Sequence, residues 1–208
     1  MRPKYILAVA LISLLAFSAC GSSQETVETS DEQEVMIGEA SSVAVDLGAS
    51  EVRWYGDKVV GSGFGGNVDL ESAELLMAGD EYVGGSFVID MTTIATDDGV
   101  EKLEAHLKNE DFFDVENYPE ASFEITEVKV RGEELGGDYE ISGNLNIMGG
   151  ANNITIVVDD EGGVLSSEFY IDRTDWGVTY GSGSVSDDLG DKAINDEIKF
   201  NVKLVLEN

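Results

Sequence analysis

Hydrophobic and polar residues alternate in short runs along most of the chain, which is the pattern of β-strands. The clearest run lies near the end, with apolar residues at Ile198, Phe200, Val202, Leu204 and Leu206. Successive side chains of a strand point to opposite faces, so this run has one apolar face and one polar face. Tyr139–Ile147 repeats the pattern, and further strands are predicted at 43–46, 51–57, 62–70, 83–91, 154–158 and around Phe123 and Phe169.

Turns rich in glycine separate these runs. They are Gly136-Gly137-Asp138, Gly149-Gly150 and Glu161-Gly162-Gly163. Glycine adopts a positive φ angle without steric cost, as tight hairpins require. About eight strands joined by short turns predict an all-β fold, either an antiparallel barrel or a sandwich, and closure into a barrel removes the exposed sheet edges.

One segment departs from the alternation. Between Gly99 and Asn109, the apolar residues Val100, Leu103 and Leu107 recur at helical spacing. Asp97 and Asp98 precede them, and aspartate commonly caps a helix N-terminus. We therefore expect a short helix across one end of the barrel.

The first nineteen residues have the composition of a secretory signal. Arg2 and Lys4 precede an apolar run that is too short to span a bilayer comfortably, and small residues precede Cys20. The run Phe17-Ser18-Ala19-Cys20 resembles the bacterial lipobox, in which the cysteine is acylated and becomes the first residue of the mature protein. Cys20 is the single cysteine of the chain, so it forms no internal disulfide. We expect a lipoprotein anchored to a membrane of the cell envelope, on its periplasmic or outer-surface side.

Residues 20–40 differ in composition from the remainder of the chain. Ser, Thr, Gln and Glu dominate there, and large apolar residues are few. Such a segment buries too little apolar surface to fold by itself, so it is predicted to be a flexible acidic tether. Residues 41–208 have the length of one domain.

The charge excludes some partners. The chain has 42 acidic and 12 basic residues, a net charge of −30, which argues against binding nucleic acid or anionic lipid surfaces. Solubility in a salty habitat explains this acidity, and calcium binding is the sharper alternative. However, Asp97-Asp98, Asp159-Asp160-Glu161 and Asp187-Asp188 do not follow the spacing of an EF-hand loop, so no metal site is predicted.

Motifs of catalysis are missing from the sequence, so no enzyme activity is predicted. It contains no nucleophile elbow, phosphate loop, zinc-spaced His/Cys set or dinucleotide fingerprint. The sole histidine, His106, is expected either to bond a strand carbonyl or to contact a ligand head group at the barrel mouth. Arg173 is expected either in a structural ion pair, with Asp90 as a candidate partner, or at a ligand oxygen.

Several strings resemble the YceI-like family of exported proteins. They occur in order through nearly the whole domain: Trp54-Tyr55-Gly56, Gly84–Met91 (GGSFVIDM), Leu103–Val115 (LEAHLKNEDFFDV), Tyr118-Pro119 with Ser122-Phe123, Gly143–Gly149 (GNLNIMG), Ile171–Gly177 (IDRTDWG) and the strand Asp196–Leu206.

The resemblance implies an extended, eight-stranded, antiparallel lipocalin-like barrel with a short helix at one end. It also implies binding of a long isoprenoid chain, such as a polyprenyl lipid or a quinone tail, with no other cofactor. Members of the family often carry a histidine between glycines near the second strand, where this chain has Gly63-Phe64-Gly65. The choice of head group therefore stays open.

An eight-stranded barrel either packs solid or holds one small ligand, and ligand pockets are mostly apolar. Each apolar inward residue alone serves core packing more often than binding, but together these residues would line any cavity. A structural lipoprotein with a solid core is the alternative function, and the oligomeric state stays open. The predicted lining residues are Trp54, Phe64, Phe87, Ile89, Met91, Phe112, Phe113, Phe123, Ile141, Leu145, Ile147, Phe169, Ile171, Trp176 and Phe200.

Overall fold

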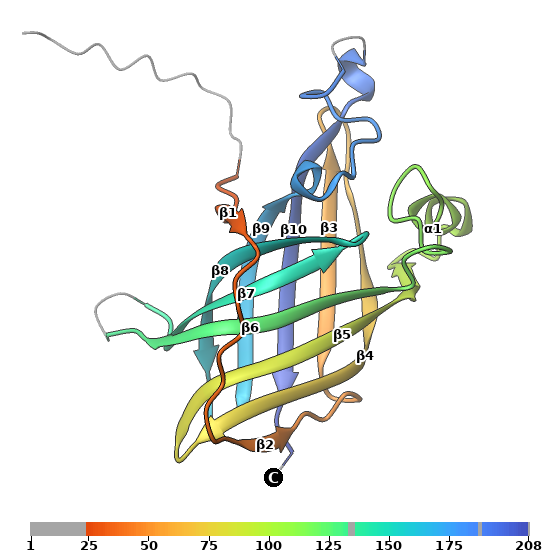
Figure 1. Ribbon diagram of the computed structural model, residues 1–208. Helices are drawn as coiled ribbons and strands as arrows, with labels where there is room; N and C mark the ends of the chain where they lie inside the picture. Colours follow the sequence, from red (N-terminus) through yellow and green to blue (C-terminus); the bar gives the residue numbers. More distant parts are fainter. Residues whose placement is uncertain (1–23, 133–135, 187–188, 208) are drawn as a thin grey trace, which may run out of the picture.

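The computed structural model describes residues 24–132, 136–186 and 189–207, and eight of its strands form a closed antiparallel β-barrel (Figure 1). The eight are β3 (Glu51–Lys58), β4 (Phe64–Ala78), β5 (Glu81–Thr96), β6 (Glu120–Val130), β7 (Tyr139–Ile147), β8 (Gly150–Asp160), β9 (Val164–Asp172) and β10 (Ile194–Val205). Their order is β8-β7-β6-β5-β4-β3-β10-β9, and β8 pairs with β9 to close the ring.

The strand registers place the predicted apolar faces of the strands inside the barrel. Phe200 lies opposite both Trp54 and Phe169, and Phe87 lies opposite Phe123. Directly opposed residues share a face of the sheet, so these aromatic side chains gather inside the barrel. The predicted all-β barrel is therefore confirmed, as is the left-handed backbone of the turn at Gly162 (φ 68°) and Gly163 (φ 92°).

Two strands are longer than the sequence pattern predicted. β4 continues to Ala78 and β5 to Thr96, and their mutual register shifts near Asn67, Leu70 and Leu76. Each shift reverses the side that later residues face, which breaks the simple period of two. Leu75 beyond the second shift is fully buried, although the predicted strand ended at Leu70.

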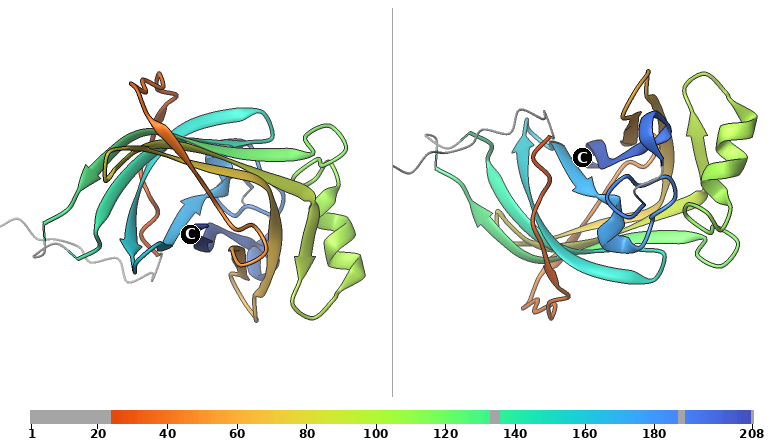
Figure 2. Two further views of the ribbon diagram at one scale, coloured as in Figure 1. Left: turned by 90° about the horizontal axis from the view of Figure 1, so that it is seen from below. Right: turned by 90° about the horizontal axis from the view of Figure 1, so that it is seen from above.

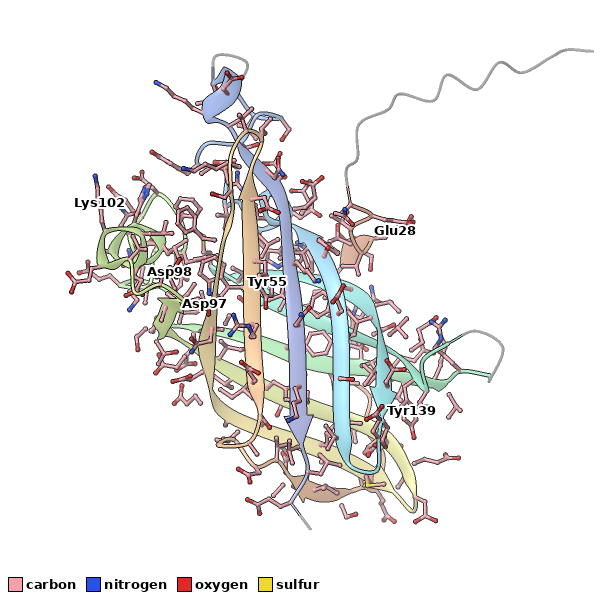
Figure 3. The ribbon with its side chains drawn as sticks, turned by 180° about the vertical axis from the view of Figure 1, so that it is seen from behind. Glu28, Tyr55, Asp97, Asp98, Lys102 and Tyr139 are labelled. Carbon is pink, nitrogen blue, oxygen red and sulfur yellow. The ribbon has the colours of Figure 1, made fainter. Side chains whose placement is uncertain are left out.

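The helix forms where it was predicted but is capped differently. α1 (Glu101–Lys108) packs on β5 and lies at one end of the barrel (Figure 1). Asp97 and Asp98 do not cap it. The N–H of Val100 donates to the Thr96 hydroxyl, and Glu104 accepts from the Thr96 N–H and hydroxyl. Asp97 instead pairs with Arg53 on β3, with Oδ2 2.6 Å from Nη2, on the outer surface (Figure 3).

Residues 24–40 form a strap across the outside of the barrel. Within it, β1 (Thr29–Asp31) pairs with Asn152–Ile154 of β8, and the Val27 N–H donates to the Tyr170 carbonyl of β9. The strap then crosses β7, β6 and β5 to β2 (Ser41–Ala44), which pairs with β4 (Figures 1 and 2). Residues 27–33 differ from the predicted flexible tether, because hydrogen bonds to β7, β8 and β9 hold this polar segment, which has little apolar surface.

Asn144 of β7 fixes the middle of the strap. Its Oδ1 accepts from the Gln33 N–H at 3.0 Å, and its Nδ2 donates to the Gln33 carbonyl at 2.8 Å. Asn153 donates to the same Oδ1 at 2.9 Å. Both asparagines are buried beneath the strap, so each of these bonds satisfies a group that has lost water.

Replacement of Asn144 by alanine should lower the free energy of unfolding. The change removes three hydrogen bonds, two with the Gln33 main chain and one from the buried Asn153 side chain, at a total cost of about 1–3 kcal/mol. The matched control is Asn146→Ala, which faces outward on the same strand and should stay within about 0.5 kcal/mol of the parent. Urea unfolding measures both, and equal losses would contradict the role given to Asn144.

Candidate ligand-binding site

An apolar cavity of about 610 Å³ runs inside the barrel. All eight barrel strands and α1 contribute to its wall, which consists almost entirely of aliphatic and aromatic side chains. Along β10 its lining includes Ile194 and Asn195 and then every second residue from Ile198 to Leu204. Six residue steps of a strand measure about 20 Å, so the cavity suits an elongated ligand rather than a compact one.

Rows of aromatic residues form part of this wall. The rings of Phe169 and Phe200 stack with centroids 5.6 Å apart, and those of Phe87 and Phe123 lie 6.3 Å apart. Gly143 makes room for the second pair, because a Cβ there would lie 2.4 Å from Cζ of Phe123. The glycine inside β7 is therefore explained by the close approach of an aromatic ring.

Thirteen of the fifteen predicted lining residues lie on the cavity wall, and their role in ligand binding stays a prediction. These thirteen are Trp54, Phe64, Phe87, Ile89, Met91, Phe112, Phe113, Phe123, Ile141, Leu145, Ile147, Phe169 and Phe200.

Ile171 and Trp176 do not line the cavity. Both are buried in the core cluster beside Val178. The indole N–H of Trp176 donates to the Leu145 carbonyl at 2.8 Å, which directs the ring into packed protein. Trp176 belongs to the 3₁₀-helix η1 (Arg173–Trp176), where the period of two no longer applies.

Other parts of the wall were not predicted from the sequence. Val68, Ile125, Ile154 and Ile198 are aliphatic positions on the inner faces of predicted strands, so the alternation was sufficient to find them. Polar residues at one end were also missed: Lys58, Lys102, Tyr180, Lys192 and Asn195. No pattern in the sequence relates Lys58 to Lys192, because the fold alone brings them to one opening.

This opening is called the mouth, and it lies between α1, the β3–β4 turn and the described residues 177–186 and 189–193. Arg173 supports it from below, with 2% of its side chain exposed. Its guanidinium donates to the carbonyls of Val178, Ile194 and Asn195 and to Asp196 Oδ1 at 3.1 Å. Burial lowers its pKa from the ordinary value, and Asp196 opposes that shift.

Arg173 is therefore in a structural ion pair, as one of the two alternatives predicted, but its partner is not Asp90. Asp90 accepts from Thr92 on β5, whereas Asp196 lies beside Arg173 on β10. Oδ2 of Asp196 accepts hydrogen bonds from the hydroxyls of Ser182 and Ser184, which follow η1 in the chain. These hydrogen bonds join η1 and β10 to Ser182 and Ser184. The 3₁₀-helix η2 (Gly190–Lys192) comes later in the chain.

His106 lies on α1 at the same mouth. Its Nε2 is 3.3 Å from Asp111 Oδ2, and its ring meets those of Phe112 and Tyr180 edge to face. The structure shows these contacts in place of the expected bond to a strand carbonyl. His106 lines the cavity, so its predicted contact with a ligand head group stays open.

In the part of the chain that the structure describes, no group of three or more His, Cys, Asp or Glu is arranged to hold a metal ion. No helix within the same part is long and apolar enough to cross a membrane. Cys20, the predicted signal residues 1–19 and Asp187-Asp188 lie outside the described residues.

Comparisons with known proteins agree with this architecture. The crystal structure of Burkholderia cenocepacia BcnA superposes with a TM-score of 0.61 at 23% identity, covering 77% of this chain and 98% of that one. A polyisoprenoid binding domain from Saccharophagus degradans gives a TM-score of 0.56 at 14% identity, covering 81% and 99%. The Campylobacter jejuni YCEI protein gives 0.52 at 17% identity, covering 68% and 84%.

These identities are low, and the three likenesses show a shared fold. No curated protein sequence matches the chain. The YceI-like domain matches residues 40–206, which include the whole barrel and the mouth. The chain therefore belongs to the YceI-like domain family.

Proposed function

We propose that this protein is an envelope lipoprotein that binds a long apolar isoprenoid-type lipid inside its barrel. The ligand would be a polyprenyl lipid or a quinone tail, held for carriage, storage or protection. The observation that carries the proposal is the elongated apolar cavity of about 610 Å³. Ligand pockets commonly have volumes of about 300–1,000 Å³ and are mostly apolar.

The chemistry of the wall favours a hydrocarbon chain. Apolar surface removed from water contributes about 25 cal/mol per Å², and this contribution needs no directional partner. A wall of leucine, isoleucine, valine and phenylalanine would thus hold a branched chain along its whole length. The Saccharophagus degradans domain of the same fold is described as polyisoprenoid-binding, which supports this choice of ligand.

The cavity favours a binding role over the alternative of a solid-packed barrel. The buried residues form two clusters, one around Trp54, Phe112 and Trp176 and one around Leu75, Phe87 and Leu165. The cavity touches both clusters, and Leu70, Phe123 and Ile156 pack against both. A binding role therefore uses a feature that a structural role would leave unexplained.

The strap supports the proposed anchor. Val27 bonds to Tyr170 near the mouth, and Thr29 donates to Asp175 of η1 at 3.1 Å. Cys20 precedes Val27 by seven residues. Seven extended residues span at most about 25 Å, so an acylated Cys20 would keep the mouth close to the membrane that holds the lipid.

The proposal predicts that protein purified from its own host contains a prenyl lipid. Native mass spectrometry should show added mass, and organic extraction should release a compound with isoprene repeats. After extraction, the protein should take up geranylgeraniol. A protein that is free of lipid when isolated, and that takes up neither geranylgeraniol nor a quinone, would contradict the proposed function.

Filling the cavity should abolish this uptake without unfolding the barrel. Val202→Trp places a large ring on the wall, where a filled core would lose about 1–3 kcal/mol from overpacking but a hollow one has room. Lys203→Trp is the matched control, because Lys203 is exposed and faces outward on the same strand. Thermal unfolding and geranylgeraniol titration separate the two effects. Full uptake by folded Val202→Trp would place the ligand elsewhere.

The anchor has a separate test. Cys20→Ala should prevent incorporation of radiolabelled palmitate in the host, because it removes the residue to which the acyl chains would attach. It should also release the protein from the membrane fraction, since stable anchoring needs more than one acyl chain. Ser22→Ala is the control, since it leaves the cysteine in place. Labelling that persists in Cys20→Ala would show that Cys20 is not the acylated residue.

A further inference from the structure

The joint between β8 and β9 has the shortest ladder of the barrel wall. β8 pairs with β7 at nine positions, and β9 pairs with β10 at nine. By contrast, the direct pairing of β8 with β9 consists of Asp159 with Ser166 and Asp160 with Leu165. These two pairs lie at the end away from the mouth. Nearer the mouth, the main-chain ring is therefore completed by something other than a direct ladder between the two strands.

The strap occupies the place of the missing ladder. Thr29 of β1 lies opposite Ile154 of β8, and the Val27 N–H donates to the Tyr170 carbonyl of β9 at 2.8 Å. Figure 1 shows β1 beside these two strands. Neighbouring strands lie about 4.8 Å apart, so a segment that bonds to both holds β8 and β9 roughly 10 Å apart. Release of the strap would leave a gap of that width in the wall.

Two serines show that the cavity extends into this seam. Ser166 and Ser167 both line the cavity, although they are consecutive residues of β9. Leu165 and Phe169 face the interior, so Ser167 faces inward and Ser166 outward. Ser166 is also exposed. A cavity wall that includes an exposed, outward-facing residue extends to the outer surface at that position.

The apolar interior lies directly behind the strap. Val27 packs against the core cluster that contains Ile154. Ile154 and Ile156 of β8 and Phe169 of β9 line the cavity. Glu28 is exposed and lies on the outer side of the strap (Figure 3). Residues 27–29 therefore separate the cavity from solvent, and their departure would open the cavity sideways.

Mostly polar contacts hold the strap in place. Gln33 exchanges two hydrogen bonds with Asn144, and the Thr29 hydroxyl donates to Asp175 Oδ2 at 3.1 Å. Each such bond contributes modestly to stability, because water replaces it when the strap leaves. Segments with few buried apolar contacts open locally more readily than strands inside a full ladder. The strap is thus the part of this wall that separates most easily.

We propose that the strap is a lateral gate, through which the isoprenoid chain enters the cavity between β8 and β9. This inference rests on the proposed function and specifies the route by which its ligand enters. Residues 27–33 leave the seam as a unit, because release from one strand alone would keep the strap across the gap. A long chain then enters along its side, whereas entry at the mouth would thread it end-on through about 20 Å.

A disulfide that fastens the strap tests the gate. Asp31→Cys and Asn152→Cys are introduced into the full chain with Cys20→Ala, so that the new pair are the only cysteines. Asp31 and Asn152 lie directly opposite each other, and the Cα spacing of such pairs suits a disulfide. Stopped-flow uptake of geranylgeraniol should be about tenfold or more slower in the oxidised than in the reduced protein. The affinity should change less than about twofold, because neither residue lines the cavity.

A second disulfide is the matched control. Ala44→Cys with Glu74→Cys joins β2 to β4, at the other end of the same N-terminal segment. Both residues are exposed and directly opposed, as a disulfide requires. Its oxidation leaves residues 27–33 free to move, so the rate of uptake should stay within about twofold of the reduced form.

Loosening the strap should have the opposite effect. Asn144→Ala removes the contacts with Gln33 and should accelerate uptake about fivefold or more, because the open state becomes more populated. Asn146→Ala is the control on the same strand and should leave the rate unchanged. Amide hydrogen exchange measures the opening itself. Exchange of residues 27–33 should be faster in Asn144→Ala than in the parent, with the amides of β10 unaffected.

The outcomes separate the gate from the proposed function. Equal uptake rates in the oxidised and reduced Asp31→Cys/Asn152→Cys protein would overturn the gate, and so would equal slowing in the β2–β4 control. An unchanged rate in Asn144→Ala, despite faster exchange of residues 27–33, would overturn it independently of any disulfide. In each of these cases the proposed function stands. Absence of uptake in the parent protein would contradict the proposed function itself.

Discussion

The closed ring of main-chain hydrogen bonds is the constraint on which this molecule depends. Closure of eight strands fixes the diameter of the barrel and directs every second side chain inward. Phe87, Phe123, Phe169 and Phe200 then pack in pairs on the cavity wall. The cavity is therefore a consequence of strand number and side-chain size, and it does not require a specialised loop or a second domain.

The seam between β8 and β9 is reinforced by a segment that is not part of the eight barrel strands. β8 and β9 pair through Asp159 with Ser166 and Asp160 with Leu165, at the end away from the mouth. Nearer the mouth, residues 27–31 bond to both strands, through β1 on one side and Tyr170 on the other. The strap thus reinforces the seam of the barrel, and it couples the N-terminal segment to the end where the cavity opens.

Much of the fold was predictable because strands obey a simple rule. Alternation located the eight strands and eleven of the cavity residues, the adjacent Phe112 and Phe113 were the other two, and helical spacing located α1. The prediction failed where that rule gives no information. Bulges extended β4 past Leu70, the main-chain bonds of residues 24–40 left no hydrophobic signal, and Asp196 rather than Asp90 reached Arg173. Each case depends on contacts between residues far apart in the chain.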